Sequence, residues 1–104
     1  ASEAGFGHLR TVCADVAGWM EGAEAHDFDL VVLDPPRTGA GDRVMERLRR
    51  WHPGTIVVVS CDPQTLCRDL ARLVPDRYRI DSVVGLDLFP QSYHFETVVR
   101  LARV

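Results

Sequence analysis

Three short stretches of this 104-residue sequence hold residue types that can do chemistry. In "DPPR", Asp34 closes an apolar run, and its carboxylate could accept hydrogen bonds from the amines or ring N–H groups of a ligand. In "SCDP", the thiol of Cys61 stands directly before Asp62. In "YHFE", His94 and Glu96 would share one face of a strand, because alternate residues of a strand point the same way. The sequence thus offers a nucleophile, an acid–base pair and a ligand-binding carboxylate.

The position of Cys61 favours reactivity. It follows the β-branched run Thr55–Ser60, and after it Asp62 fits a helix N-cap while Pro63 fits the first helical position, where a missing N–H costs nothing. A sulfur beside a helix N-terminus lies in partial positive charge, which favours the reactive thiolate. An isolated cysteine is often only a small buried hydrophobic group, and that interpretation stays open on spacing alone.

The other candidates also have structural interpretations. Asp34 could cap a loop or pair with Arg37, although two prolines stiffen that loop as a site of fixed geometry requires. His94 and Glu96 could be an acid–base pair or part of a solvated strand face, and alternation does not decide between them. The remaining cysteines and histidines form no constellation, and we expect them to be structural: Cys13, Cys67, His8, His26 and His52.

Length and composition bound the class of protein. The length predicts a single domain, and a net charge of -3 gives no basic field that would by itself indicate a nucleic-acid partner. No run approaches the ~20 apolar residues that a membrane helix needs, and the first residues do not form a secretory signal. Three cysteines without a C-x-x-C motif predict neither a disulfide framework nor a zinc site, so we expect reduced thiols in the cytoplasm.

Apolar runs and helical periodicities alternate along the chain. Their order predicts an α/β fold with a mostly parallel sheet and helices on its faces. The short "PQSY" join predicts that the last two strands form an antiparallel hairpin. Ligands gather at the carboxyl ends of such strands, where the loops "DPPR", "SCDP" and "FPQSYHFE" would meet. The expected strands are 9–15, 28–34, 55–60, 78–89 and 94–104, and the expected helices are 16–23, 42–51 and 63–74.

Taken together, "DPPRTG", "SCDPQTLCRDL" and "LDLFPQSYHFE" resemble the class I S-adenosylmethionine-dependent RNA uracil-5 methyltransferases, which make 5-methyluridine in transfer or ribosomal RNA. The resemblance runs from about Leu9 to the end of the chain and implies the C-terminal portion of a class I, Rossmann-like sheet. Two positions depart from the family's commonest pattern, Tyr-x-Ser-Cys-Asn: Val58 replaces the tyrosine and Asp62 the asparagine. Neither departure removes a reacting group.

The resemblance implies a role for each candidate residue. Cys61 matches the nucleophile that adds to C6 of the target uracil, and Glu96 matches the base that later removes the C5 proton. Asp34 matches the residue that holds cofactor and target base in position. Asp15 matches an acidic or amide position that contacts the cofactor adenosine. Substrate positioning would also involve Arg37 and His94.

The implied cofactor is S-adenosylmethionine, and the implied partner is RNA, whose target base would have to leave its stack. The sequence has neither the glycine-rich cofactor loop of class I methyltransferases nor the family's N-terminal RNA-binding domain. We therefore expect residues 1–104 to be a partial catalytic domain, inactive alone, that meets RNA through a longer protein. Without the missing strands, the strand at 28–34 would have an exposed edge. The chain would self-associate through that edge unless its first strand moved inward.

Two other interpretations stay open. A Cys–His hydrolase would use Cys61 and His94, but it would leave "DPPR" and Glu96 without a role. A methyltransferase-like fold could also serve only as a binding or structural module. Amino-group methyltransferases carry Asp-Pro-Pro as well, but typically with an aromatic residue next, where this chain has Arg37.

Overall fold

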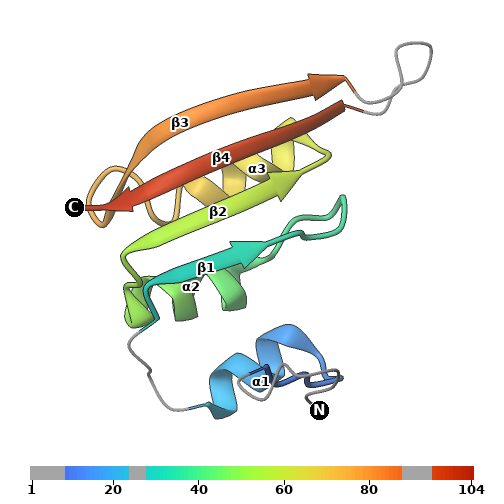
Figure 1. Ribbon diagram of the computed structural model, residues 1–104, viewed down its shortest axis with the longest axis vertical. Coiled ribbons are helices and arrows are strands. Elements are labelled where there is room, and N and C mark those ends of the chain that lie inside the picture. The colour runs from blue at the N-terminus through green and yellow to red at the C-terminus, as the bar shows by residue number, and fades with distance from the viewer. Residues whose placement is uncertain (1–8, 24–27, 88–94) are drawn as a thin grey trace.

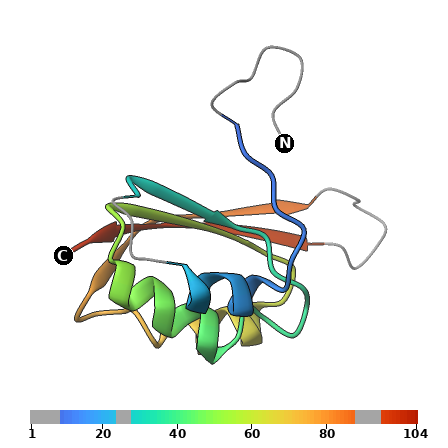
Figure 2. The same cartoon turned by 90° about the horizontal axis from the view of Figure 1, so that it is seen from below.

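The computed structural model describes residues 9–23, 28–87 and 95–104. Its elements are α1 (Val16–Gly22), β1 (Leu30–Leu33), α2 (Asp42–Trp51), β2 (Thr55–Ser60), α3 (Pro63–Leu70), β3 (Tyr78–Asp87) and β4 (Phe95–Arg103). The strands form one sheet in the order β1, β2, β4, β3 (Figure 1). Figure 2 shows the helices on a single face of that sheet. Within these ranges, no helix is long and apolar enough to cross a membrane.

The sheet is mixed. β1 and β2 are parallel, whereas β4 is antiparallel to both β2 and β3. The expected hairpin of the last two strands is therefore confirmed. The expectation of a mostly parallel sheet is wrong for the described residues, because only one of the three strand pairs is parallel. The physical reason is that β4 turns back from β3 and takes the place beside β2, so both of its ladders are antiparallel.

The expected first strand is absent from the described sheet. Residues 9–15 pair with none of its strands, and Leu9 and Val12 are half exposed. Strand-forming residue types do not make a strand unless a neighbour offers backbone partners. The option in which this segment moves inward to cover β1 is therefore wrong for the described residues.

The helix expected at 63–74 is shorter than its apolar spacing suggests. α3 ends at Leu70, and turns follow up to β3. Pro75 disfavours helical backbone at the residue before it, so the chain leaves the helix early. Leu73 nevertheless reaches the core from the turn, where it is fully buried.

The hydrophobic core lies between the sheet and the helices. Ile56 and Val58 of β2 are buried against the helices, as the period of two in a strand requires. α2 and α3 each direct an apolar stripe toward this face. Burying each large side chain stabilises the fold by about 1.5–3 kcal/mol. The buried apolar residues are Met20, Val44, Met45, Leu48, Ile56, Val58, Leu66, Leu70, Leu73, Tyr78, Val99 and Leu101.

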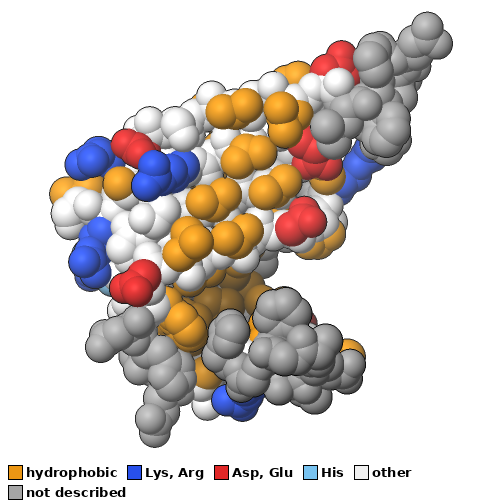
Figure 3. Space-filling model, in the orientation of Figure 1, with side chains coloured by type: hydrophobic (Ala, Val, Ile, Leu, Met, Phe, Trp, Pro, Cys, Tyr) orange, Lys and Arg blue, Asp and Glu red, His pale blue; other side chains and the backbone are white. Residues whose placement is uncertain are grey.

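The opposite face of the sheet carries no helix among the described residues. The side chains that alternate with the core residues point to this face. Figure 3 shows a band of hydrophobic side chains across it. Leu30 and Val32 of β1 are 54% and 59% exposed, and exposed apolar groups gathered in this way are typical of interaction surfaces. We call the following set the open face: Leu30, Val32, Val57, Val59, Val84, Leu86 and Val98.

Tyr78 joins the start of β3 to the turn that follows α2. Its ring is fully buried, and its hydroxyl donates a hydrogen bond to the carbonyl oxygen of Pro53. Burial raises the pKa of Tyr78 to about 12, because a charged phenolate would lose its hydration.

We expect the chain to associate with itself, because the outer edge of β1 and the open face leave backbone and apolar groups in water. Sedimentation velocity should show species larger than a monomer that increase with concentration. Val32→Lys should weaken the association, whereas Val16→Lys, at an equally exposed position of α1, should not. A monomer at every concentration, with slow amide exchange at residues 30–33, would contradict this prediction.

We expect the free energy of unfolding to fall as the pH rises from about 10, the usual pKa of tyrosine, to about 12. In this range the unfolded chain has already lost the phenolic proton that folded Tyr78 keeps, so rising pH favours unfolding. Tyr78→Phe should reduce this dependence and cost about 0.5–1.5 kcal/mol at neutral pH through the lost hydrogen bond. Thermal unfolding across the alkaline range measures both effects, and an unchanged pH slope in the variant would count against the assignment.

Candidate active site

The carboxyl ends of β1 and β2 lie at one edge of the sheet, where β3 ends and β4 begins (Figure 1). In the antiparallel ladder of β2 and β4, Ser60 lies opposite Thr97. Cys61 follows this last pair on one chain segment, and Glu96 precedes it on the other, so the strand pairing brings both residues to the same edge. Two of the predicted residues, 35 positions apart in the chain, are therefore brought together by strand pairing.

β1 brings Asp34 to the same edge. Leu33 pairs with Val58, so Asp34 comes level with the next residue of β2, two positions before Cys61. The Asp34 carboxylate is exposed and has no hydrogen-bond or ion-pair partner among the described residues. Neither a loop cap nor a pair with Arg37 is formed there, so this carboxylate is available to a ligand.

Hydrogen bonds made by Ser60 before it and Asp62 after it hold the turn that carries Cys61. The Ser60 hydroxyl donates to the carbonyl oxygen of Asp62 at 2.9 Å and accepts from the Asp62 N–H at 3.1 Å. The Asp62 carboxylate in turn caps α3, as predicted, by accepting from the N–H groups of Gln64 and Thr65 at 2.9 and 3.2 Å. The Cys61 thiol itself is exposed, so the structural interpretation as a buried hydrophobic group is wrong.

Glu96 has an unsatisfied carboxylate oxygen. Its side chain is half buried, and Oε2 is buried without a hydrogen-bond partner among the described residues. Leaving a buried polar atom unpaired costs about 1–3 kcal/mol, and such atoms in native proteins often belong to functional sites. His94, the other half of the predicted acid–base pair, lies outside the described residues.

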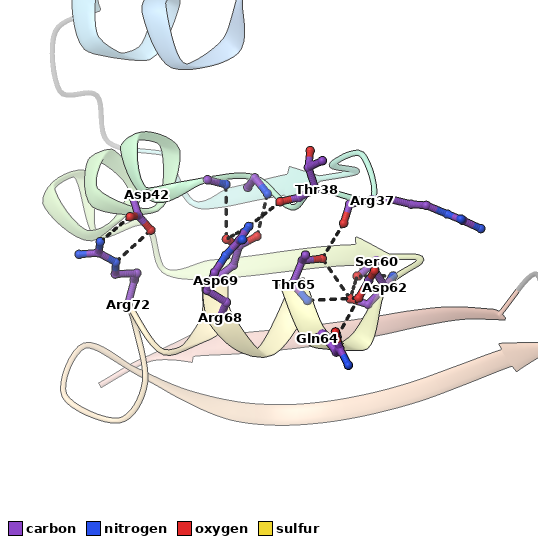
Figure 4. Close-up of polar contacts among 12 residues, drawn as sticks. Arg37, Thr38, Asp42, Ser60, Asp62, Gln64, Thr65, Arg68, Asp69 and Arg72 are labelled. Carbon is purple, nitrogen blue, oxygen red and sulfur yellow. Dashed lines mark hydrogen bonds and ion pairs between the residues drawn. The ribbon is translucent and has the colours of Figure 1, made fainter.

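The connection from Asp34 to α2, residues 35–41, lies against the side of α3 (Figure 4). We call this connection the Pro-Pro loop. Thr65 Oγ1 donates a hydrogen bond to the carbonyl oxygen of Arg37 at 2.9 Å. The guanidinium of Arg68 donates a hydrogen bond to the carbonyl oxygen of Thr38. The Arg37 side chain points away from α3 and is exposed, so only its backbone is held.

Asp69 holds the far end of the loop. Its carboxylate, 3% exposed, accepts from the N–H groups of Ala40 and Gly41 at 2.7 and 3.3 Å. Just beyond, Arg72 forms an ion pair with Asp42 at 2.8 Å. α3 therefore contacts the loop along its length.

None of the candidate residues named from the sequence lies on this polar side of α3. Thr65, Arg68 and Asp69 lie three and four residues apart, which places them on one side of a helix beside the apolar stripe. That spacing was a usable signal, and so was an aspartate inside a helix, where aspartate is a poor helix former. What such a side contacts depends on the rest of the fold.

Asp15 has a local structural role. Its Oδ2 accepts from the Gly18 N–H at 2.9 Å and so caps α1. The cofactor contact expected from the resemblance stays a prediction. Asp34 and Asp15 are the two carboxylates that the family resemblance assigns to the cofactor. In the described ranges, no cluster of His, Cys, Asp and Glu could hold a metal ion.

A cavity of about 440 Å³ lies elsewhere, among charged side chains of α1 and α2. Its carboxylates already have partners: Glu21 pairs with Arg43, and Asp42 pairs with Arg72. The hydrogen bond from Arg43 lowers the pKa of Glu21, so this carboxylate stays charged and paired. None of the candidate catalytic residues lines the cavity, and we place the site at the strand ends instead.

The sequence model of the family described as tRNA (Uracil-5-)-methyltransferase matches residues 21–104, which is more than half of the chain. The chain belongs to this family. A tRNA (uracil(54)-C(5))-methyltransferase of Pyrococcus abyssi is 50% identical over 74 residues, which cover 71% of this chain and 18% of the relative. A 23S rRNA (uracil(747)-C(5))-methyltransferase of Shewanella halifaxensis is 35% identical over 104 residues, which cover 99% of this chain and 27% of the relative.

A solved structure of a uracil-5 methyltransferase has the same fold over most of the chain. The crystal structure of the Pyrococcus abyssi tRNA (uracil-54, C5)-methyltransferase in complex with S-adenosyl-L-homocysteine matches with a TM-score of 0.69 and 44% sequence identity. The match covers 80% of this chain and 20% of that one. The chain therefore spans less than a third of the length of these relatives. The family predicted from the three motifs is confirmed.

Two glycines of the Pro-Pro loop allow a graded test of its packing. Gly39 and Gly41 have φ of 88° and 90°, which strains any other residue. A Cβ at Gly39 would lie 2.8 Å from Asp69 Oδ2, whereas a Cβ at Gly41 would meet nothing within 4 Å.

We expect Gly41→Ala to cost about 1–2 kcal/mol of stability through backbone strain alone. Gly39→Ala should cost at least about 1 kcal/mol more, because the Asp69 carboxylate must also give way. Denaturant unfolding measures both losses, with Gly22→Ala, at a position with open space, as the control. Equal losses at the two loop positions would show that α3 does not confine the loop.

Proposed function

We propose that this chain carries the nucleophile and the base of an RNA uracil-5 methyltransferase, which transfers a methyl group from S-adenosylmethionine to C5 of a uridine in tRNA or rRNA. The observation that supports this best is the register of β2 and β4, whose last pair, Ser60 and Thr97, lies directly beside Cys61 and Glu96 in the chain. The available carboxylate of Asp34 lies at the same edge. Covalent addition followed by proton removal needs a nucleophile and a base on one site.

Uracil C5 is a weak nucleophile, and Cys61 overcomes this by covalent addition. Its Sγ thiolate forms a bond to C6, and the electron pair of the C5–C6 double bond moves toward C5 and the C4 carbonyl as an enolate. The thiol is exposed at the start of α3, where a base that has left its stack can reach it. S-adenosylmethionine, when bound, supplies the methyl group that C5 takes up.

Glu96 completes the reaction by removing a proton. After methyl transfer, C5 carries both the new methyl group and its original proton. The Glu96 carboxylate takes that proton, the electron pair restores the C5–C6 double bond, and the sulfur of Cys61 leaves as thiolate. The unpaired Oε2 supports this role, since an oxygen that lacks a donor can accept the proton without breaking a hydrogen bond.

The remaining residues bind rather than react. The Asp34 carboxylate would accept hydrogen bonds from the target base and the cofactor, which suits its exposed and unpartnered state. Arg37 would supply positive charge to the substrate from the same loop, and its side chain is directed away from the fold. For Asp15 and His94 the family resemblance is the support: contact with the cofactor adenosine for the first, substrate positioning for the second.

The chain spans only a small part of the length of its relatives. Because that share is 18% and 27% for the two named relatives, we propose that the chain is a partial catalytic domain that does not turn over methyl groups by itself. It would meet tRNA or rRNA in the cytoplasm as part of a larger protein. The open face and the outer edge of β1 are the surfaces at which such a protein would continue.

The second candidate function is a non-catalytic module with a methyltransferase fold. The short span relative to the relatives favours it, whereas the exposed thiol and the unpaired carboxylate oxygen favour chemistry. A hydrolase that uses Cys61 and His94 has no support from the family match. Covalent trapping separates these functions, because only a uracil methyltransferase has reason to add to C6.

We expect the chain to form a covalent adduct with RNA that contains 5-fluorouridine, because fluorine makes C6 more electrophilic and so favours addition of the Cys61 sulfur. Intact-mass spectrometry should show the adduct, and peptide mapping should place it on Cys61. Cys61→Ser should abolish the adduct. Cys67→Ser should not, because it changes a different exposed cysteine, which lies on α3. Tritium transfer from S-adenosylmethionine to uridine RNA should stay at background.

Two results would contradict the proposal. One is an adduct that maps to Cys13 or Cys67 as readily as to Cys61, which would reflect ordinary thiol reactivity. The other is the absence of any adduct on Cys61 while iodoacetamide still alkylates it, which would favour the non-catalytic module.

A further inference from the structure

α3 connects the two halves of the candidate active site. Its N-terminus begins directly after Cys61, where Asp62 caps it. Its side holds the Pro-Pro loop, which continues from Asp34 (Figure 4). Because the backbone hydrogen bonds make two turns of helix a stiff unit, contacts that fix the loop to α3 also fix it relative to Cys61.

The hydroxyl of Thr65 acts at the near end of the loop. Oγ1 donates to the Arg37 carbonyl oxygen at 2.9 Å and lies 3.3 Å from the Asp62 carbonyl oxygen. One side chain thus reaches both the loop and the turn beside Cys61. Thr65 therefore contacts the segment that follows Asp34 and the segment that follows Cys61.

The carboxylate of Asp69 acts at the far end. It is buried, and a buried carboxylate is stable only when its oxygens accept hydrogen bonds, which the Ala40 and Gly41 N–H groups supply. Gly41 is the N-cap of α2 and has no side chain with which to cap it. The negative charge of Asp69 therefore lies at the positive end of α2, where it is favoured. A Cβ at Gly39 would lie 2.7 Å from Arg68 Nη2 and 2.8 Å from Asp69 Oδ2, so the loop backbone lies close against α3 here.

We infer that Thr65 and Asp69 are positioning residues, which hold the Pro-Pro loop, and with it Asp34, at a fixed place relative to Cys61. The inference rests on the proposed function, since addition of Cys61 to a base held by Asp34 requires a fixed separation of the two. Neither residue touches the reacting atoms. They are the support on which the geometry of the site depends.

Matched variants separate positioning from general stability. Thr65→Val removes the hydroxyl at constant shape, and Thr65→Ser keeps it. Asp69→Asn keeps the shape but turns an NH₂ group toward one of the loop N–H groups, so one of the two hydrogen bonds is lost. Asp76→Asn removes the same charge from an exposed pair with Arg49, and Ile56→Val lowers stability from within the core.

The first measurement reports the place of the loop and needs no activity. A nitroxide label on exposed Cys61, in a chain with Cys13→Ser and Cys67→Ser, broadens the NMR signals of nearby amides. The broadening at the Thr38 amide reports the separation of the loop from Cys61. Hydrogen exchange at the Ala40 amide reports the hydrogen bond to the α3 carboxylate.

We expect Thr65→Val and Asp69→Asn to change the broadening at the loop, and Asp69→Asn to speed amide exchange there roughly tenfold. Thr65→Ser, Asp76→Asn and Ile56→Val should leave both unchanged. Loop signals that keep their broadening in Thr65→Val and Asp69→Asn would overturn the inference. An Ile56→Val chain whose loop broadening changes to the same extent would also overturn the inference. If Asp69→Asn does not fold, the comparison of Thr65→Val with Thr65→Ser decides alone.

The second measurement connects positioning to the reaction. Thr65→Val should slow the trapping of Cys61 by 5-fluorouridine RNA roughly tenfold, while iodoacetamide alkylates the thiol at the parent rate. Equal slowing of both reactions would mean a disturbed thiol and would count against positioning. If the parent chain forms no adduct, the proposed function fails, and the nitroxide measurement still decides whether these two residues hold the loop.

Discussion

The backbone pairing of β2 with its two neighbours is the interaction on which the rest of the structure depends. On one side β1 runs parallel to β2 and ends directly before Asp34, and on the other side β4 runs antiparallel and begins next to Glu96. β2 itself ends at Ser60, directly before Cys61. A slip of one residue in either ladder would turn core residues to the open face and separate these side chains. The core and the candidate site thus depend on the same register.

α3 fixes the loops of the candidate site relative to the paired strands. Its first turn fixes the backbone around Cys61 through Ser60 and Asp62, and its polar side holds the Pro-Pro loop by hydrogen bonds to backbone groups. Backbone contacts leave the side chains of the loop available, and this is what a binding loop needs: a fixed path and exposed functional groups. The same helix buries its apolar stripe against the sheet, so the site is supported by the core.

Local sequence was sufficient where a local physical rule decides the structure. The cap by Asp62, the break at Pro35 and Pro36, the end of α2 before Pro53, and the hairpin of the last two strands all follow from neighbouring residues. The three motifs also identified the family. The strand expected at 9–15 failed, because a strand needs a partner and local residues do not reveal whether one exists.

The sequence by itself determined the family, the candidate residues of the site and most of the helices and strands that carry them. Only the tertiary structure decided that β4 inserts beside β2, that this pairing ends next to Cys61 and Glu96, and that Asp69 of α3 holds the loop after Asp34. These outcomes depend on pairing between segments far apart in the chain. Such pairing is chosen by the competition for backbone partners and buried surface across the whole fold, and no short stretch of sequence contains that competition.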